Sequence, residues 1–218
     1  MTPKIVFEDT HLIVLSKPAG LLSQGEKTGD VNLVDWLRQY LGRPYVGLVH
    51  RLDRNTSGLL VVAKRTKSAN RLTQALQSGE LKRKYLAWLV GDLREAKQWR
   101  HWLVKNESTN LVRAYREGER IPSEAKEARL SVKPLEHRVV QGTPVTLAEF
   151  ELETGRSHQI RAQAAAEGLP LLGDQKYGRP NDPPFSRTAL QSYWIEFPHP
   201  MSGDVLKFEE PLAEDLRI

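Results

Sequence analysis

The sequence predicts an α+β protein whose central sheet is mixed, largely antiparallel, and flanked by helices and loops. Predicted strands outnumber predicted helices, and they occur in pairs without a regular alternation of strand and helix. The 218 residues are enough to bury a sizeable core, and the chain shows no internal repeat, low-complexity tract or clear linker. We therefore expect one domain, residues 1–218.

The first third of the chain predicts a hairpin, a helix and two short strands. Two apolar runs within residues 4–16 are separated by turn-forming residues, which is typical of a hairpin. Asp30 is expected to cap a helix whose apolar residues recur at helical spacing and which ends before Gly42. Strands are expected at residues 48–49 and 59–63, with a polar loop at residues 50–58 between them and a helix at residues 68–77 after them.

Strands dominate the rest of the chain. Residues 91–126 are the exception, because they are polar and are expected to be irregular, although they include Trp99 and Trp102. Ser157 is expected to cap a helix that runs to Glu167. The expected strands are residues 84–90, 128–135, 145–152, 189–197 and 205–208.

The composition is basic and lacks cysteine. Lys and Arg number 32 against 27 Asp and Glu, a net charge of +5. Such a balance attracts polyanions, but it counts as evidence only where the basic residues surround a chemical site. The absence of cysteine excludes disulfides, thiolate metal sites and a cysteine nucleophile. The six histidines show no metal-ligand spacing, so no metal is expected.

The sequence has no secretory segment at its start. It also has no apolar run that approaches the ~20 residues needed to span a bilayer. We therefore expect a cytoplasmic protein without membrane contact.

The loop at residues 50–58 has the most informative sequence, His-Arg-Leu-Asp-Arg-Asn-Thr-Ser-Gly. Asp53 follows one apolar strand, precedes another, and is flanked by Arg51 and Arg54. Loops on a rigid sheet often carry catalytic groups. An arginine within ~4–6 Å keeps a carboxylate ionised for use as a nucleophile or general base. Considered alone, the pattern is more typical of a charged turn in which Asp53 bonds its own backbone or an arginine.

Two further segments combine basic residues with a feature that can bind RNA. Residues 154–161, Thr-Gly-Arg-Ser-His-Gln-Ile-Arg, open a predicted helix, and Arg156 and Arg161 suit a phosphate or a catalytic carboxylate there. Their simpler interpretation is solvated arginines on a capped surface helix. Residues 82–85, Lys-Arg-Lys-Tyr, offer a ring for base stacking beside lysines for phosphates, or equally an edge strand protected by its lysines.

Taken in order, these segments resemble the RluA family of RNA pseudouridine synthases over most of the chain. Residues 50–64 resemble the family signature H-R-L-D-x-x-T-S-G-L-L-x-x-A-K nearly without a gap, and this signature is long enough to be specific. The remaining segments occur in register with it. Residues 16–21, 82–87, 154–161 and 172–178 resemble K-P-x-G-L, K-x-Y-x-A, T-G-R-x-H-Q-I-R and L-G-D-x-x-Y-G.

The resemblance implies a pseudouridine synthase catalytic fold, a reaction and a set of residue roles. The reaction is the isomerisation of uridine in structured RNA after the base is flipped out of its stack, with no cofactor or metal. Asp53 corresponds to the catalytic aspartate, Tyr85 to the tyrosine that stacks on the target base, and Arg156 to the basic residue that pairs with the aspartate. Arg51 corresponds to the arginine that helps displace the base. The other expected RNA contacts are Lys82, Lys84 and Arg161.

Two departures from the family pattern are visible. Many members begin with a small S4 RNA-binding domain. Here the Lys-Pro-Ala-Gly-Leu element starts at Lys17 and leaves no room for one, so a stand-alone catalytic domain is expected to bind the RNA. The family often has Leu-His-Ala in a late strand, where this chain has Gln191 in place of the histidine. That change bears on substrate choice and leaves the three expected catalytic residues intact.

Three functions remain in competition. The first is an RNA pseudouridine synthase, expected to be a monomer that acts on tRNA or rRNA. The second is a non-catalytic RNA-binding module on the same fold, which the intact catalytic residues disfavour. The third is a carboxylate-dependent glycosidase, which needs a second carboxylate, and Asp174 is the other loop carboxylate within a motif.

Overall fold

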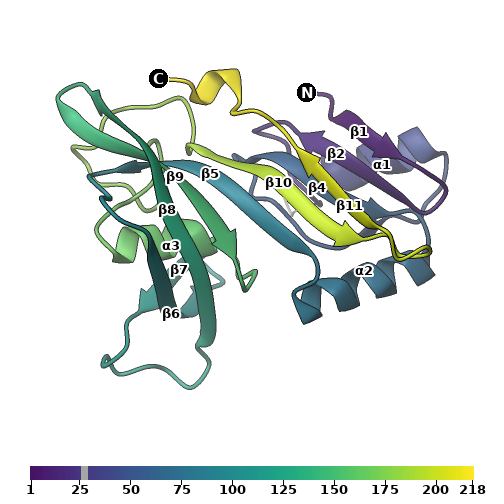
Figure 1. The fold of residues 1–218 in the computed structure, drawn as a ribbon, viewed down its shortest axis with the longest axis horizontal. Coiled ribbons are helices and arrows are strands. Elements are labelled where there is room, and N and C mark those ends of the chain that lie inside the picture. The colour runs from purple at the N-terminus through teal and green to yellow at the C-terminus, as the bar shows by residue number, and fades with distance from the viewer. Residues whose placement is uncertain (26–28) are drawn as a thin grey trace. The chain divides into compact units, whose positions relative to one another are not determined.

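The computed structural model describes residues 1–25 and 29–218 (Figure 1). The chain divides into two compact units. The first consists of Met1–Arg83 and Gln191–Ala213, and the second of Lys84–Leu190 and Glu214–Ile218. Each unit combines helices with mostly antiparallel strands, so the predicted α+β class is confirmed. Within the described residues, no helix is both long and apolar enough to cross a bilayer.

The sheet of the first unit is built around a central strand, β4. The predicted hairpin is present, and its second strand pairs antiparallel with β4. β4 also pairs with a short β3 and, in parallel, with the start of β10, which in turn pairs with β11. The strands are β1 (Lys4–Glu8), β2 (Leu12–Lys17), β3 (Gly47–Leu48), β4 (Ser57–Ala63), β10 (Leu190–Pro198) and β11 (Val205–Glu209).

Two helices accompany this sheet, α1 (Leu33–Leu41) and α2 (Thr66–Ser78). The helix predicted after Asp30 is present, but its cap was predicted wrongly. The side chain of Asn32 accepts the hydrogen bond from the Asp35 amide at 3.1 Å and so caps α1. Asp30 instead pairs with Arg54 at 3.0 Å.

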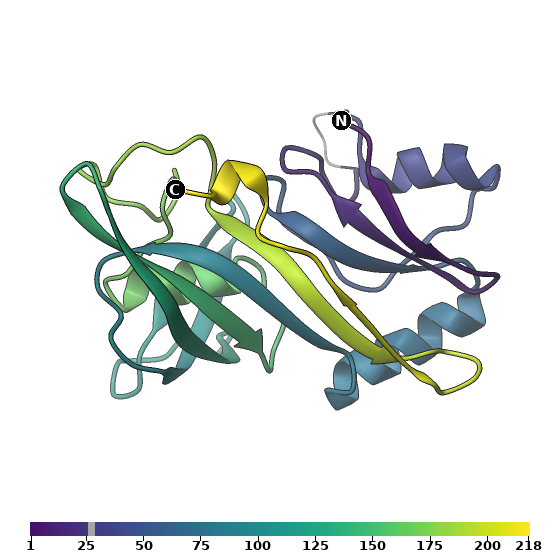
Figure 2. The same cartoon turned by 45° about the horizontal axis from the view of Figure 1, so that its top comes forward.

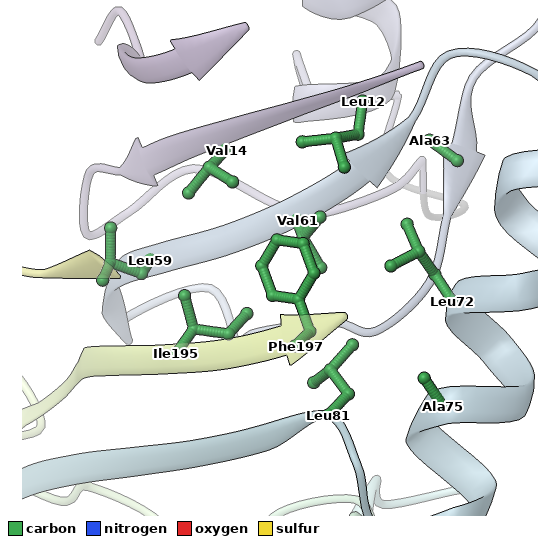
Figure 3. Packing of buried hydrophobic residues seen from close by; sticks show 10 residues of the cluster. All are labelled: Leu12, Val14, Leu59, Val61, Ala63, Leu72, Ala75, Leu81, Ile195 and Phe197. Atoms are coloured by element: carbon green, nitrogen blue, oxygen red, sulfur yellow. The ribbon is translucent and has the colours of Figure 1, made fainter. Parts of the chain in front are cut away.

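The core of the first unit lies between the strands and α2. Alternate residues of β2 and β4 point to the same face of the sheet, where α2 and β10 add their apolar side chains (Figure 3). Figure 2 shows α2 beside the β10–β11 hairpin, where the Arg71 side chain donates to the Pro200 carbonyl at 2.6 Å. The core residues are Leu12, Val14, Leu59, Val61, Ala63, Leu72, Ala75, Leu81, Ile195 and Phe197.

Gly58 explains why the Thr-Ser-Gly part of the signature needs its glycine. Its φ of +112° is a conformation that other residues rarely adopt. A Cβ at this position would lie 2.1 Å from the carbonyl oxygen of Ser192 in β10. The glycine therefore lets β10 approach the end of the loop that carries Asp53.

The second unit contains five antiparallel strands in the order β5-β9-β8-β6-β7. The prediction that residues 91–126 are irregular was wrong, because β6 and β7 form a hairpin within them. The outward positions of β6 hold a mixture of polar and apolar residues, Gln98, Arg100, Trp102 and Val104, so its alternation is hidden in the sequence. The strands are β5 (Lys82–Val90), β6 (Lys97–Asn106), β7 (Leu111–Tyr115), β8 (Lys126–Val140) and β9 (Thr143–Leu152).

Helix α3 (Gln159–Ala166) covers one face of this sheet. Ala162 packs there against Leu103, Val112 and Ala128. The helix begins at Gln159 and not, as predicted, after a Ser157 cap. His158 occupies the N-cap with a φ of +50° and makes no side-chain capping bond. The start of the helix is therefore held by other contacts, which lie in the candidate site.

Candidate active site

The predicted site residues are distributed over both units. Arg51, Asp53 and Lys82 belong to the first unit, and Lys84, Tyr85, Arg156 and Arg161 belong to the second. In the first unit Arg51 and Asp53 share the loop before β4, and in the second Arg156 and Arg161 lie in the turn before α3 and at the start of that helix. Lys82, Lys84 and Tyr85 lie on β5.

Asp53 lies in the loop between β3 and β4, where it is partly buried. Its carbonyl accepts a hydrogen bond from the Thr56 amide at 3.1 Å, which closes a turn over residues 53–56. Arg51 is exposed. Arg54 turns away from the loop, since its guanidinium donates to the Gly20 carbonyl at 3.2 Å and pairs with Asp30. Of the two arginines that flank Asp53 in the sequence, Arg54 therefore has a structural role.

The Lys-Pro-Ala-Gly-Leu segment holds the Asp53 loop on the side that follows the aspartate. Lys17 is completely buried, and its Nζ donates to the carbonyls of Pro18, Leu21 and Arg54 at 3.0, 2.7 and 3.2 Å. The Gly20 amide donates to the same Arg54 carbonyl at 2.7 Å. The loop is thus anchored one residue after Asp53.

The residue before Asp53 is fixed as well. Ser23 Oγ donates to the Leu52 carbonyl at 2.7 Å and accepts from the Leu52 amide at 3.1 Å. Asp53 therefore sits between two anchored peptides. Sequence reasoning included this segment only as part of a motif and assigned Lys17 no role. The position of this lysine between an apolar strand and a Pro-x-Gly turn was the feature of the sequence that could have indicated its role.

His50 is a buried, neutral histidine three residues before Asp53. Its Nε2 accepts from the Val61 amide at 3.4 Å, which places the proton on Nδ1. Burial lowers the pKa of His50 to about 3, and the charge of Arg83 adds to this shift. Within the described residues, His50 Nδ1 has no hydrogen-bond partner.

The Lys-Arg-Lys-Tyr segment places its two lysines on the face of the sheet opposite to its tyrosine ring. Tyr85 is only 5% exposed and lies opposite Phe150 of β9. Because side chains alternate along a strand, Lys84 points to the other face of the sheet. There it lies 3.5 Å from both Glu149 and Glu151. Burial lowers the pKa of Lys84, but the two carboxylates outweigh burial and raise the pKa above its usual value.

Lys82 precedes this pair and is exposed. It lies 3.7 Å from Glu196. Lys82 is thus more exposed than Lys84 and has one acidic partner where Lys84 has two.

The turn before α3 is tied together by Gln159, which is 3% exposed. Its Oε1 accepts from the Thr154 hydroxyl at 2.8 Å and from the Arg156 amide at 2.9 Å, and its Nε2 donates to the Arg129 carbonyl at 3.1 Å. Arg156 itself is exposed, and its Nε donates to the Glu127 carbonyl at 3.0 Å.

Arg161 differs from Arg156 in burial and in fixation. It is 9% exposed and makes a two-point ion pair with Asp174, with Nε–Oδ2 at 2.6 Å and Nη2–Oδ1 at 2.8 Å. Its guanidinium lies 5.1 Å from the centre of the Tyr177 ring. A bidentate pair of this kind fixes both position and orientation of the cation.

The Asp174 carboxylate accepts hydrogen bonds that hold neighbouring groups in place. Besides Arg161, its Oδ1 accepts from the amides of Lys176 and Tyr177 at 3.0 and 3.2 Å. The Tyr177 hydroxyl in turn contacts His158 Nδ1 at 2.8 Å and accepts from the Val112 amide at 2.8 Å. The carboxylate is fully occupied, which argues against Asp174 as the second carboxylate of a glycosidase.

Gln191, which stands where the family pattern has histidine, bonds to the backbone of the C-terminal segment. Its Nε2 donates to the Pro211 carbonyl at 2.9 Å, and its Oε1 accepts from the Ala213 amide at 2.8 Å. Both ends of the amide are used, so Gln191 organises the segment after β11.

The described part of the chain holds no cluster of three or more His, Cys, Asp or Glu side chains able to bind a metal ion.

A family model described as RNA pseudouridylate synthase matches residues 11–166. The chain belongs to this family. The matched region includes the Asp53 loop, Tyr85 and the turn with Arg156 and Arg161. The family expected from the sequence is therefore confirmed.

Curated relatives of the family match nearly the whole chain. A ribosomal large subunit pseudouridine synthase D from Nitrosomonas europaea is 37% identical over 98% of this chain and 63% of its own length. A ribosomal large subunit pseudouridine synthase C from Haemophilus influenzae is 33% identical over 98% of this chain and 66% of its own length. The chain thus spans a little under two thirds of these two relatives.

Solved structures support the pseudouridine synthase fold. The human RNA pseudouridylate synthase domain containing 1 aligns with a TM-score of 0.80 at 24% identity, covering 96% of this chain and 83% of that chain. The human RNA pseudouridylate synthase domain containing 4 aligns with a TM-score of 0.78 at 20% identity, covering 98% and 90%. At these identities the likeness concerns the fold alone.

Proposed function

We propose that this chain isomerises uridine to pseudouridine in structured RNA, with the Asp53 carboxylate essential for the reaction. The observation that carries the proposal is the anchoring of the Asp53 loop: peptides on both sides of this aspartate are held by the Lys-Pro-Ala-Gly-Leu segment and by Ser23. Catalysis requires groups held in place before the substrate arrives, and this loop meets that requirement. A non-catalytic RNA-binding module needs no such fixation of an acidic residue.

The chemistry breaks the bond between ribose and a uracil nitrogen, turns the base, and rejoins it through carbon. The target nucleotide must leave the stack first, at a cost of a few kcal/mol. Asp53 supplies the carboxylate for this reaction, and Arg51 helps to displace the base. Tyr85 contacts the detached base.

Two arginines could complete the catalytic set, and they differ in how firmly their side chains are held in place. Sequence reasoning gave this role to Arg156 and a substrate-binding role to Arg161. Arg161 is buried and held at two points, whereas Arg156 is exposed and bonded through Nε to a backbone carbonyl. Since a cation acts most strongly when it is preorganised away from water, we assign the catalytic role to Arg161 and RNA binding to Arg156.

The proposed substrate is ribosomal RNA. Its support is the printed names of the relatives, which are pseudouridine synthases of the large ribosomal subunit. Transfer RNA is the alternative substrate. Lys82 is exposed and can contact the RNA backbone, and Lys84 contributes only if RNA displaces its two glutamates.

The proposal treats residues 1–218 as one catalytic domain. The family model supports this, because its match from residue 11 to residue 166 includes parts of both compact units. The proposed enzyme is a cytoplasmic monomer that needs no cofactor.

The proposal is tested by mapping pseudouridine after incubation of the protein with unmodified rRNA and tRNA transcripts. Carbodiimide treatment followed by primer extension locates each modified position. We expect stops at discrete uridines of large-subunit rRNA with the wild-type protein and none with Asp53→Asn. RNA binding without any modified uridine would favour the non-catalytic module instead.

A further inference from the structure

The face of β6, β7 and β8 that lies opposite α3 carries an ordered set of arginine and aromatic side chains. The register fixes this: Leu103 and Ala128 pack toward α3, so the residues between them in alternation point outward. The outward residues include Arg100 and Trp102 on β6, Arg113 and Tyr115 on β7, and Glu127 and Arg129 on β8. We call these six residues the outer face of the β6–β8 sheet.

Two arginines of the outer face stack on its two aromatic rings. The Arg100 guanidinium carbon lies 4.9 Å from the centre of the Trp102 ring, and that of Arg113 lies 4.6 Å from the centre of the Tyr115 ring. Trp102 and Tyr115 are direct partners across the two strands, so the two stacks are neighbours. Both rings are partly exposed, and both arginines are exposed.

The charge on the outer face favours an anion. The Glu127 carboxylate forms ion pairs with Arg100 at 2.6 Å and with Arg129 at 3.3 Å. Arg129 also forms an ion pair with Glu153 at 3.0 Å. Arg156 extends the same surface, because its Nε donates to the Glu127 carbonyl. The pKa of Glu127 lies below its usual value mainly because of the hydrogen bond from Arg100, with Arg129 and Arg156 adding to the effect. The outer face and its extension therefore carry four arginines, Arg100, Arg113, Arg129 and Arg156, against two glutamates, Glu127 and Glu153.

We propose that the outer face of the β6–β8 sheet binds an unpaired strand of the substrate RNA. Unstacked bases pack on aromatic rings and on guanidinium planes, and arginines meet the phosphates between them. A duplex offers no free base faces, so the surface selects single-stranded RNA. The inference rests on the proposed function and adds to it the part of the RNA that this surface contacts.

The test measures the binding of the full chain to a labelled single-stranded oligouridine over a range of salt concentrations. Arg100→Gln combined with Arg113→Gln should weaken binding at least tenfold. It should also reduce the slope of log K against log salt by about 1.4, since each lost phosphate contact contributes about 0.7 for a single strand. Trp102→Leu combined with Tyr115→Leu should weaken binding without changing the slope, because leucine keeps the packing but not the stacking.

Two further double variants test whether the planar guanidinium groups are needed, and whether the loss of positive charge elsewhere in the unit has the same effect. Arg100→Lys with Arg113→Lys should keep the salt slope and still weaken binding, because lysine lacks a planar face. Arg94→Gln with Arg138→Gln removes the same charge from exposed arginines of this unit that also pair with nearby acids, Asp92 and Glu136. This control should bind like the wild type. Thermal unfolding of every variant checks that the fold is retained.

The outcomes separate this inference from the proposed function. The inference is overturned if the wild type does not bind oligouridine, or if the Gln pair and the Leu pair bind like the control. It is also overturned if the Gln control loses as much affinity as the Arg100 and Arg113 pair. The proposed function fails separately, if the wild type modifies no uridine in any RNA while these binding differences are present.

Discussion

Arg161 and Asp174 form a buried, two-point ion pair in the second unit, with contacts of 2.6 and 2.8 Å. The side chain of Asp174 is completely buried and that of Arg161 is 10% exposed. Gly173 makes this arrangement possible, since its φ is +71° and a Cβ there would lie 2.3 Å from the Arg187 carbonyl oxygen. The Gly-Asp pair of the Leu-Gly-Asp motif therefore holds an arginine in a fixed orientation.

Asp174→Asn should destabilise the protein strongly. Removing one partner of a buried ion pair leaves an uncompensated charge, at a cost of about 3–5 kcal/mol. The free energy of unfolding from urea denaturation measures the loss. Asp92→Asn is the control, because its partners Arg94 and His137 lie at the surface, where screened ion pairs contribute little to stability. Equal stability of the two variants would contradict the assigned role of Asp174.

The two arginines of the Thr-Gly-Arg-Ser-His-Gln-Ile-Arg segment should respond differently to lysine. Arg161→Lys loses the bidentate grip of Asp174, and kcat should fall on the order of 100-fold, as it does when one preorganised donor is removed. Arg156→Lys keeps a charge at an exposed position and should change kcat less than about tenfold. Single-turnover rates on the same RNA compare them. A larger loss with Arg156→Lys would return the catalytic role to Arg156.

Lys17→Met should loosen the Asp53 loop. Methionine fills a similar volume but donates no hydrogen bond to the carbonyls of Leu21 and Arg54, and each lost bond from a charged donor costs about 1.5–3 kcal/mol. We expect lower stability and, in the folded fraction, a lower kcat. Hydrogen exchange of the amides at residues 52–56 reports the loosening directly. Unchanged exchange together with full activity would exclude Lys17 as the anchor.

His50 should make stability fall in acid. Its folded pKa of about 3 lies below its ordinary value of 6.5, so the unfolded chain binds a proton that the folded chain does not. This stability is fully present above pH 6.5 and is lost as the pH falls toward 3, at up to about 1.4 kcal/mol per pH unit. His50→Gln keeps an acceptor for the Val61 amide and should show a shallower decline. Urea denaturation between these pH values compares the two slopes, and parallel slopes would contradict the buried neutral state.

The sequence predicted most of the strands, including β8 and β11 with one polar face, but missed the β6–β7 hairpin. β4 reads as a continuous apolar run because both of its faces are buried, and its bounds were predicted to within two residues. β6 alternates buried Trp99, His101 and Leu103 with the outward residues Gln98, Arg100, Trp102 and Val104, and the polar, charged residues around it made the segment read as a loop. The hairpin was therefore missed although its alternation was present.

The sequence predicted which residues belong to the site but not the contacts that each of them makes. The position of Asp53 in a loop between strands followed from the apolar runs around it, and the family signature followed from the order of its residues. The difference between Arg156 and Arg161 depends on burial and on partners far away in the sequence, such as Asp174. The pairing of Lys84 with Glu149 and Glu151 depends on the register of β5 with β9. These relations arise from tertiary packing, which a local pattern does not contain.

The central claim is that the Asp53 carboxylate is essential for conversion of uridine to pseudouridine. Release of tritium from RNA labelled at carbon 5 of uracil tests it most directly, because rejoining the base through that carbon displaces the label. Wild type, Asp53→Asn and a control with an exposed aspartate changed, Asp204→Asn, are incubated with labelled rRNA and tRNA transcripts. We expect release by the wild type and by Asp204→Asn, and none by Asp53→Asn. Equal release by Asp53→Asn, or no release by the wild type from any RNA that it binds, would contradict the account.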